Sequence, residues 1–296
     1  MKNLISKIIP KTFLSKLRSL LKNRRFKKRT SQMSKLSEVD FINGLKEVGI
    51  EMGDTVFVHC SLSKLGFVEN GPLDIINALK KIITSKGNII IPSFSILHSM
   101  EETLKTKTYS FNVLKTKAST GSLPNLFLKT DNVKRSIHPT HSVAVWGKDS
   151  DYLINGHYKA ETNFGEDTPF KKFLNMNGKI LGLGVNYAPI TFYHTYEDLN
   201  LDKFPDVYLD EKIPALMIDE NQNSLESKFF CHSKEYAEKR IEKDSTIQNY
   251  FQQVFEESIS KNIVFGDSQI WWMYSKELID KLDELNTQGV TIYEIL

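Results

Sequence analysis

Residues 53–91 read GDTVFVHCSLSKLGFVENGPLDIINALKKIITSKGNIII, and this stretch decides the fold. The apolar run 56–60 predicts a buried strand, and 88–91 predicts a second one. Between them, 72–83 shows helical spacing with Pro72 in its first turn, and Gly87 is expected to close this helix. A strand, a helix and a strand in succession are typical of an α/β domain.

The same alternation continues outward to the end of the chain. After residue 36 the sequence shows neither an internal repeat nor a low-complexity linker. We therefore expect one domain over 37–296. Its further predicted elements are a short helix at 122–128 capped by Ser122, strands at 142–146, 179–183 and 263–265, and helices at 190–199 and 271–285.

The composition is that of an ordinary globular protein, with 296 residues of which 40% are hydrophobic and 25% charged. Two distant cysteines, Cys60 and Cys231, make no disulfide framework and indicate a reducing cytosol. No apolar run is long enough to span a membrane, and Lys7, Lys11 and Lys16 interrupt any secretory signal. We expect a cytoplasmic protein.

Residues 1–36 form a strongly basic arm with twelve Lys or Arg and no Asp or Glu, which leaves 27 basic against 36 acidic residues elsewhere. Apolar residues at helical spacing between these cations suit an anionic membrane surface, so peripheral binding at the inner membrane is one interpretation. A frayed tail, or a helix docked on a partner subunit, is the alternative. Nucleic acid is not expected as a partner, because the arm has no recognised fold and the body is acidic.

The strongest candidate site is residues 191–198, TFYHTYED, which follow the Gly-rich end of a predicted strand. Open α/β sheets usually bind their ligands at such strand ends. His194 and Glu197 are three residues apart and share one helix face with Thr191. A carboxylate there can fix the imidazole tautomer and leave the other nitrogen free to accept a proton. A surface or structural histidine is the alternative reading of this pair.

A second candidate is the turn Ser61-Leu62-Ser63-Lys64-Leu65-Gly66 after the first strand. Successive backbone N–H groups in such a turn can hold an anion or a pantetheine chain. The Walker spacing is missing, so this is no P-loop. A capped strand-to-loop turn without a ligand is the alternative. Cys60 beside it is more typical of a buried cysteine than of an acyl-carrying nucleophile.

The loop at 135–142 gathers a cation, two histidines and hydroxyl groups before a strand. Arg135 and His138 are candidates for phosphate or adenine contacts, because a guanidinium fork suits phosphate oxygens. His138 and His141 lack a third ligand at useful spacing, so no metal site is expected.

Taken in order, these motifs resemble the aminoglycoside 3-N-acetyltransferase family. The similar features are GDTVFVH (53–59), SLSKLG (61–66), GNIIIPS (87–93), GSLPN (121–125), RSIHP (135–139), SVA (142–144), DTP (167–169), GKILGLG (178–184) and the T-x-x-H-x-x-E pattern at 191–197. The resemblance implies an α/β/α sandwich around a mixed, largely parallel central sheet. It also implies acetyl-CoA as co-substrate, bound with the help of the 61–66 turn, and catalysis by Thr191, His194 and Glu197.

The resemblance predicts direct acetyl transfer to an amine, with His194 as general base and no metal. The acceptor is either an aminoglycoside or an amino sugar on a nucleotide or lipid carrier used in surface-polysaccharide synthesis. Asp198, Glu166 and Asp167 are candidates for attracting a cationic acceptor. A homodimer is an alternative to a monomer. Two rival readings are a histidine-metal hydrolase and a membrane or polyanion binding protein derived from the fold.

Overall fold

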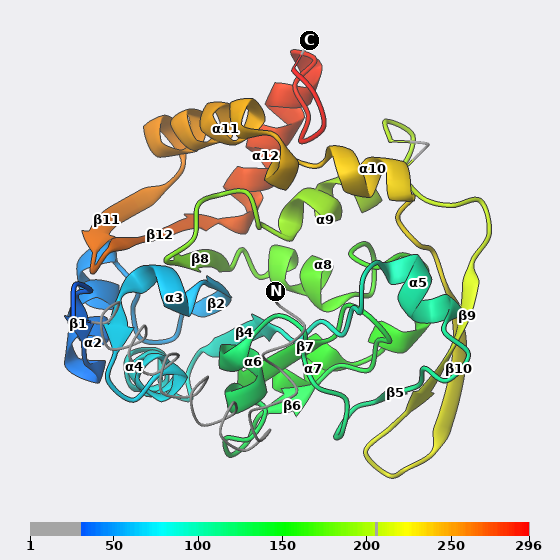
Figure 1. Ribbon diagram of the computed structural model, residues 1–296, viewed down its shortest axis with the longest axis horizontal. Helices are drawn as coiled ribbons and strands as arrows, with labels where there is room; N and C mark the ends of the chain where they lie inside the picture. The colour runs from blue at the N-terminus through cyan, green and yellow to red at the C-terminus, as the bar shows by residue number, and fades with distance from the viewer. Residues whose placement is uncertain (1–30, 205–206, 296) are drawn as a thin grey trace, which may run out of the picture.

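The computed structural model describes residues 31–204 and 207–295, and a seven-stranded sheet lies at its centre (Figure 1). Only β8, β2 and β4 run parallel; the other neighbouring pairs are antiparallel. The predicted α/β fold with a mixed sheet is confirmed, but the sheet is only partly parallel, in its central three strands, and not largely parallel as predicted. In spatial order the strands are β11 (Lys261–Phe265), β12 (Ser268–Tyr274), β8 (Lys179–Leu183), β2 (Thr55–Cys60), β4 (Asn88–Pro92), β7 (Val143–Gly147) and β6 (Lys134–Arg135).

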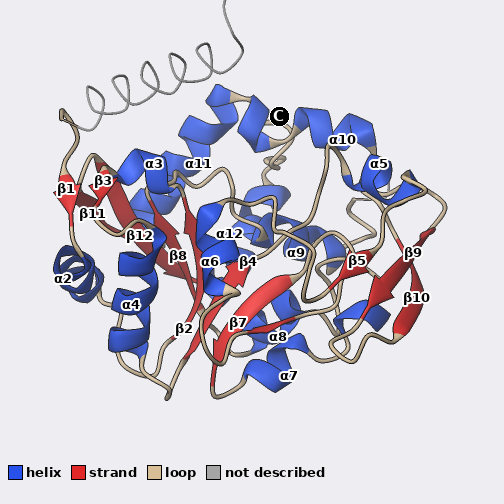
Figure 2. Cartoon of the chain, turned by 60° about the horizontal axis from the view of Figure 1, so that its bottom comes forward, coloured by secondary structure: helices blue, strands red, loops and turns tan. Residues whose placement is uncertain are grey.

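Both faces of this sheet are covered by helices, which makes the molecule an α/β/α sandwich (Figure 2). Alternate residues of β2 enter different cores, Phe57 on one face and Val56 and Val58 on the other, as the pleat requires. One face packs on α2 (Glu38–Val48), α4 (Pro72–Ile83) and α6 (Ser122–Phe127), and the other on α8 (Pro169–Asn175), α9 (Phe192–Asp198), α11 (Ser245–Ser258) and α12 (Ser275–Thr287).

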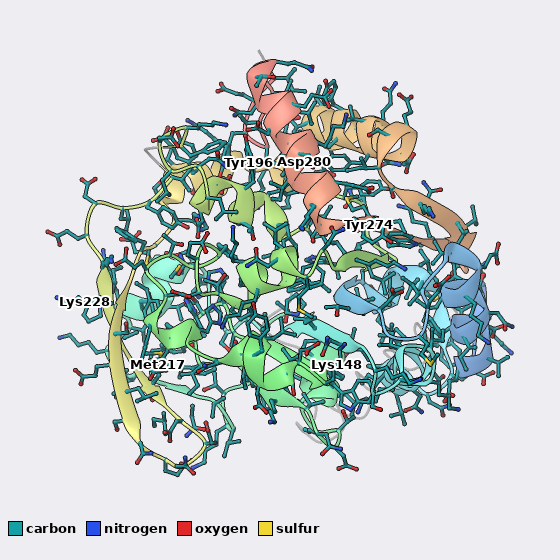
Figure 3. All side chains as sticks on the ribbon, turned by 180° about the vertical axis from the view of Figure 1, so that it is seen from behind. Lys148, Tyr196, Met217, Lys228, Tyr274 and Asp280 are labelled. Atoms are coloured by element: carbon teal, nitrogen blue, oxygen red, sulfur yellow. The ribbon has the colours of Figure 1, made fainter. Side chains whose placement is uncertain are left out.

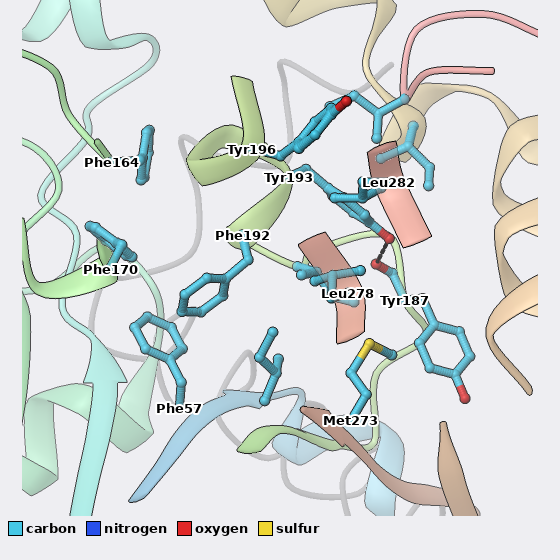
Figure 4. Packing of buried hydrophobic residues seen from close by; sticks show 14 of the residues in the cluster. Phe57, Phe164, Phe170, Tyr187, Phe192, Tyr193, Tyr196, Met273, Leu278 and Leu282 are labelled. Carbon is cyan, nitrogen blue, oxygen red and sulfur yellow. Dashed lines mark hydrogen bonds between the residues drawn. The ribbon is translucent and has the colours of Figure 1, made fainter. Parts of the chain in front are cut away.

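Aromatic packing fixes α9 on the sheet (Figure 4). The ring centroid of Phe192, at the start of α9, lies 5.0 Å from Phe57 of β2 and 5.0 Å from Phe173 of α8. Aromatic pairs of this kind contribute about 0.5–1.5 kcal/mol beyond the area they bury. The Tyr193 hydroxyl also donates to the Tyr187 carbonyl at 2.8 Å. The position of α9 therefore follows from a rigid core.

A smaller sheet forms a separate layer from β5 (Phe111–Asn112), β9 (Ile213–Ile218) and β10 (Ser224–Phe229). This small sheet has a separate apolar cluster, in which Met217 is buried together with residues of α5 (Met100–Lys105), whereas Lys228 extends outward from β10 (Figure 3). The remaining elements are β1 (Lys35–Leu36), β3 (Phe67–Val68), α3 (Leu62–Leu65), α7 (Ser150–Ile154), η2 (His157–Lys159), α10 (Lys234–Lys239) and η3 (Ile241–Lys243).

The helix predicted at 271–285 is wrong at its start. Trp271–Tyr274 belongs to strand β12, and α12 begins only at Ser275. The error has a physical cause: both faces of this strand are buried, Trp271 and Met273 in one core and Trp272 in the other. A strand buried on both faces reads as a continuous apolar run, which periodicity cannot distinguish from a helix.

Two expected helix ends also differ in detail. Gly87 does not close α4, because the helix ends at Ile83 and Thr84 follows with a φ of 57°. Gly87 instead lies where the chain passes close to the neighbouring strand, since a Cβ there would come within 2.1 Å of the Asp54 carbonyl oxygen. Ser122 is the first helical residue of α6 and caps nothing; Gly121 occupies the N-cap.

The predicted basic arm falls almost wholly outside the described residues, which contain only 31–36 of it. Its membrane interpretation, and the boundary at 36/37, stay predictions. Within 31–204 and 207–295, no helix combines the length and the apolar character needed to cross a bilayer.

The pairing of β8 with β12 generates a stability prediction at Gly182. Trp271 lies directly across the ladder, its indole Nε1 donates to the Val185 carbonyl at 2.7 Å, and a Cβ on Gly182 would meet the indole at 2.1 Å. Overpacking of this kind typically costs about 1–3 kcal/mol. Gly182→Ala should lower the free energy of unfolding by about that amount in urea titrations.

Truncating the indole provides the control for that substitution. In the double variant Gly182→Ala/Trp271→Phe, the added methyl occupies space that the smaller ring leaves, so the two losses should sum to more than the double loss. Strict additivity of the two losses would show that the indole is not what excludes a side chain at Gly182.

Candidate functional site

The loop after β8 leads into α9, and in this helix His194 lies one turn before Glu197. Nδ1 of His194 and Oε2 of Glu197 are 2.7 Å apart. Every residue of α9 is buried, which is unusual for a helix carrying four polar side chains. The hydrogen bond therefore forms in an interior of low dielectric constant, where it is electrostatically stronger than in water.

Burial sets the ionisation of this pair. Burial, followed by the positive charge of Arg240, lowers the pKa of His194 to about 3. Burial also raises the pKa of Glu197 to about 7. The imidazole is thus neutral at pH 7, and a proton on Nδ1 that is donated to Glu197 leaves Nε2 as the acceptor nitrogen. A neutral imidazole with a free nitrogen is the form in which histidine removes a proton.

His194 opens into a cavity of about 330 Å³, called here the histidine cavity. The cavity mixes apolar walls with imidazole rings, and Thr191 lines it beside His194. Residues from the sheet, from the loop after β8 and from the segment before α11 meet in it. Its polar lining residues are His59, Cys60, Thr120, His141, Thr191, His194, His232, Arg240 and Glu242.

A second cavity of about 540 Å³, called here the serine groove, adjoins the first. Its lining includes Ser61, Leu62, Ser63 and Gly66, four of the five residues predicted in this turn; the fifth, Lys64, is exposed in the same turn but lines neither cavity. The two cavities share three lining residues, which are Cys60, Thr120 and Leu123. The predicted cofactor turn and His194 of the predicted His–Glu pair thus line adjoining cavities.

Arg135 and His138 lie apart from these two cavities. Nε of Arg135 donates to the Ser142 hydroxyl at 3.0 Å, and Nη2 donates to the carbonyl of Ser93 at 2.6 Å. His138 is completely buried, and its Nδ1 accepts the backbone N–H of His141 at 2.9 Å. These side chains organise the turn before β7, and the structure does not bring them to the serine groove.

The three predicted acidic residues lie outside the histidine cavity as well. Asp198 is buried, accepts the backbone N–H of Phe164 at 2.7 Å and is hydrogen-bonded by the Tyr208 hydroxyl. Glu166 is exposed and pairs with Lys171 at 3.1 Å. Asp167 is exposed in a turn with a φ of 63°. None of them lines the cavity beside His194.

Sequence reasoning missed several residues that surround His194. His232 has its ring centroid 4.7 Å from that of His194, and Arg240 and Glu242 follow on the same segment. His141, which the sequence analysis considered only as a metal ligand, also lines the cavity, and its ring centroid lies 4.8 Å from that of Phe164, whose ring also contacts His194. No spacing in the sequence signals this group, because its members come from segments far apart in the chain.

His194, Glu197 and His232 also form a group that could hold a metal ion. One ligand atom from each lies within 4.8 Å of the others, and Glu197 Oε1 and His232 Nε2 are buried without a hydrogen-bond partner. Two imidazoles and a carboxylate are ligands that zinc accepts. This set differs from the His138 and His141 pair that the sequence analysis considered, and the expectation of no metal remains a prediction.

The fold and the site together define an α/β sandwich protein with a buried histidine–carboxylate pair whose His194 lines one of two adjoining cavities. The family model for aminoglycoside 3-N-acetyltransferases matches residues 57–286. The chain belongs to the aminoglycoside 3-N-acetyltransferase family, as the sequence motifs predicted.

Individual relatives agree with this family. The chain is 32% identical to an SPbeta prophage-derived aminoglycoside N(3′)-acetyltransferase-like protein YokD of Bacillus subtilis, over 52% of this chain but only 61% of that protein, less than two thirds of its length. The crystal structure of Bacillus subtilis YokD is similar with a TM-score of 0.70 and 25% identity, covering 89% of this chain and 99% of that one. A structure of AAC-IIIb with CoASH has a TM-score of 0.66 and 18% identity, covering 83% and 94%.

The enclosed histidines generate a prediction of acid lability. Burial lowers the pKa of six of the seven histidines, whereas it raises the pKa of two carboxyl groups, those of Glu197 and Asp198. Below about pH 6.5 the unfolded chain binds protons at these histidines that the folded chain does not bind, so stability falls as the pH falls. The two carboxyl groups act in the opposite direction but are fewer.

Urea unfolding at pH 7.5, 6.5 and 5.5 measures this effect. A single group can change the free energy of unfolding by at most about 1.4 kcal/mol per pH unit. The decrease in the free energy of unfolding between pH 6.5 and pH 5.5 should be larger than that. A free energy of unfolding that stays level across this interval would show that these imidazoles can be protonated without opening the fold.

Proposed function

We propose that this protein is an acetyl-CoA-dependent N-acetyltransferase that acetylates an amine of an aminoglycoside or a related amino sugar. The observation that carries the proposal is the His194–Glu197 hydrogen bond at the wall of a cavity that adjoins a second, groove-like one. Acetyl transfer needs a thioester and an amine to meet beside a base, and connected cavities with His194 in one of them suit that requirement.

In this proposal the serine groove receives the pantetheine chain of acetyl-CoA. Its lining is largely apolar between the hydroxyl groups of Ser61, Ser63 and Ser122, which suits an alkyl chain interrupted by amides. The thioester would lie near Cys60, Thr120 and Leu123, where the groove meets the histidine cavity. The relative AAC-IIIb was solved with CoASH, which supports the same co-substrate here. Lys64, exposed in this turn, would contribute at the rim.

The proposed reaction is a direct transfer of the acetyl group from the CoA sulfur to the amine nitrogen. The amine nitrogen attacks the thioester carbonyl carbon while Nε2 of His194 takes the amine proton, which is typically worth about 10²–10⁴ in rate. The negative charge on the carbonyl oxygen is met by the Thr191 hydroxyl, which lines the cavity beside His194. When the C–S bond breaks, the imidazolium returns its proton to the sulfur, and CoA leaves as the thiol.

The proposal assigns no metal to His194, because its mechanism needs Nε2 to accept the amine proton while Nδ1 is hydrogen-bonded to Oε2 of Glu197 at 2.7 Å. A zinc hydrolase built on His194, Glu197 and His232 is the rival, and it predicts an activity that a chelator removes. A binding protein without catalysis is the second rival. It predicts that residues 1–36 carry the whole function, together with any attachment to an anionic membrane surface.

Two further expectations belong to this proposal. We place the enzyme in the cytoplasm, where acetyl-CoA is supplied, with residues 1–36 as a means of binding the inner membrane surface; assembly as a homodimer is the alternative to a monomer.

Susceptibility tests of cells expressing the protein would distinguish detoxification from sugar biosynthesis. Unchanged aminoglycoside susceptibility would count against the first.

Replacing the base tests the proposal most simply. His194→Ala should lower kcat for acetyl transfer by about 10²–10⁴ while the protein still binds CoA in calorimetry, because the serine groove is left intact. His98→Ala is the matched control, since His98 is exposed and lines neither cavity. Turnover of His194→Ala close to wild type would remove His194 from the mechanism, and loss of turnover on treatment with EDTA would favour the zinc hydrolase.

Replacing the carboxylate tests the role of Glu197 through pH. In the wild type, protonation of Glu197, whose pKa burial raises to about 7, should reduce kcat as the pH falls through that value. In Glu197→Gln the amide oxygen can still accept from Nδ1, but no anion stabilises the imidazolium. The plateau of kcat should therefore fall about 10–100-fold, and the acidic limb should move to lower pH. An unchanged limb would show that Glu197 does not govern the base.

A further inference from the structure

A second imidazole lies beside the pair of His194 and Glu197. The ring centroids of His232 and His194 are 4.7 Å apart, and both side chains line the histidine cavity. One ligand atom from each of His194, Glu197 and His232 lies within 4.8 Å of the others. Among the described residues, no other set of three histidine, cysteine, aspartate or glutamate side chains comes together in this way. The three residues are called here the His–Glu–His group.

The surrounding structure holds His232 in this position. Two backbone hydrogen bonds, at 2.8 Å each, pair the chain on either side of it with residues 207–209. Its ring stacks on that of Tyr208, with 4.8 Å between the centroids and 14° between the planes, and the Tyr208 hydroxyl in turn donates to Asp198. His194 is held equally firmly by the packing of α9. Both imidazoles therefore keep their positions without a ligand, as a preformed site requires.

Nε2 of His232 has no hydrogen-bond partner within residues 31–204 and 207–295, and solvent does not reach it. A buried polar atom without a partner is rare in proteins and needs an explanation. A metal ion can provide the missing partner, because it is smaller than a water molecule and binds the nitrogen lone pair directly. Burial lowers the pKa of His232 and of His194 to about 3, so both imidazoles have the neutral form that binds metals.

The ligand types of the His–Glu–His group are those of zinc. Zinc sites with three protein ligands combine imidazole nitrogens with a carboxylate oxygen and leave a further position open. Here His194 and His232 line the histidine cavity, which gives the ion a path of entry and room for its open position. Ligand atoms around one tetrahedral zinc ion are about 3–3.5 Å apart, so the side chains would close by roughly 1 Å. Magnesium and calcium prefer oxygen ligands and do not suit this group.

A metal ion in the His–Glu–His group is incompatible with His194 as a general base. If the ion binds Nε2 of His194, it occupies the lone pair that would accept the amine proton. If it binds Nδ1, the neutral imidazole must carry its proton on Nε2. In both cases no ring nitrogen of His194 is left to take a proton from the amine.

We propose that His194, Glu197 and His232 form a zinc site, and that zinc bound there holds the acetyltransferase inactive. Zinc in this role is a reversible inhibitor, whereas a zinc hydrolase would need the ion for its reaction. The inhibitory part of this inference rests on the proposed function. The metal site itself does not, because zinc binding is measurable without turnover.

Calorimetry with zinc chloride tests the metal site. The sample is the full-length, tag-free protein, freed of metal by EDTA and dialysis. It should bind one zinc ion per chain with a Kd of about 1 µM or lower. Magnesium chloride should give no binding under the same conditions, because imidazole nitrogens are poor ligands for magnesium.

Two variants assign the binding to the His–Glu–His group. In His232→Gln the affinity for zinc should fall by more than the 10–100-fold that loss of an outer-shell partner typically costs (about that range), because a ligand itself is lost. His59→Gln is the matched control: His59 is also buried, lines the same cavity and has an unpartnered Nε2, but it does not belong to the group. Its Kd for zinc should equal that of the wild type. Thermal melting curves check that both variants are folded.

Acetylation of kanamycin and of glucosamine tests the inhibition. The mass of the acetylated product is measured, because zinc interferes with the detection of free CoA thiol. Saturating zinc should lower the wild-type rate by about 10²-fold or more, the amount that loss of a general base costs, and EDTA should restore it. The same zinc concentration should not inhibit His232→Gln.

The outcomes separate this inference from the proposed function. Wild-type protein that binds no zinc, or a His232→Gln variant that binds it as the wild type does, overturns the metal site and leaves the acetyltransferase standing. Zinc that binds at the site without slowing acetylation overturns the inhibition. Acetylation that requires zinc overturns both the inhibition and the metal-free mechanism. Failure to acetylate either acceptor, by a protein that binds CoA and zinc, overturns the proposed function and the inhibition with it.

Discussion

The hydrogen bond between His194 and Glu197 is the interaction on which the site depends. A buried carboxylate and a buried imidazole would each be costly alone, because neither can be hydrated inside the fold. Together they satisfy one another at 2.7 Å and fix which imidazole nitrogen carries the proton. Both residues belong to the short, fully buried helix α9, and His194 lines the histidine cavity.

The rest of the fold supplies the rigidity that this pair requires. Phe192 anchors the start of α9 between Phe57 and Phe173, and the strand carrying Phe57 ends at Cys60, where the two cavities meet. A single strand thus carries both the packing that fixes α9 and the turn that lines the serine groove. The central sheet consequently helps to fix the position of the serine groove relative to His194.

The sequence predicted what is encoded locally. Helix 72–83 and strand 179–183 match α4 and β8 residue for residue, and the spacing of His194 and Glu197 gave their shared helix face. It could not predict how segments far apart in the chain converge. His232, Arg240 and Glu242 reach the cavity through tertiary packing of the chain before α11, which leaves no spacing to read. For the same reason the sequence could not show that Arg135 and Asp198 are hydrogen-bonded inside the fold, or that Glu166 and Asp167 are exposed outside the cavity.

The central claim is that His194 is neutral at pH 7, with its proton on Nδ1 and its Nε2 free. Nitrogen-15 NMR of the histidine-labelled protein, assigned by comparison with His194→Gln, measures that state directly through the two ring-nitrogen shifts. The account predicts a protonated Nδ1 and an unprotonated Nε2 for His194 at pH 7. A protonated Nε2, whether in the other neutral tautomer or in an imidazolium, would contradict it.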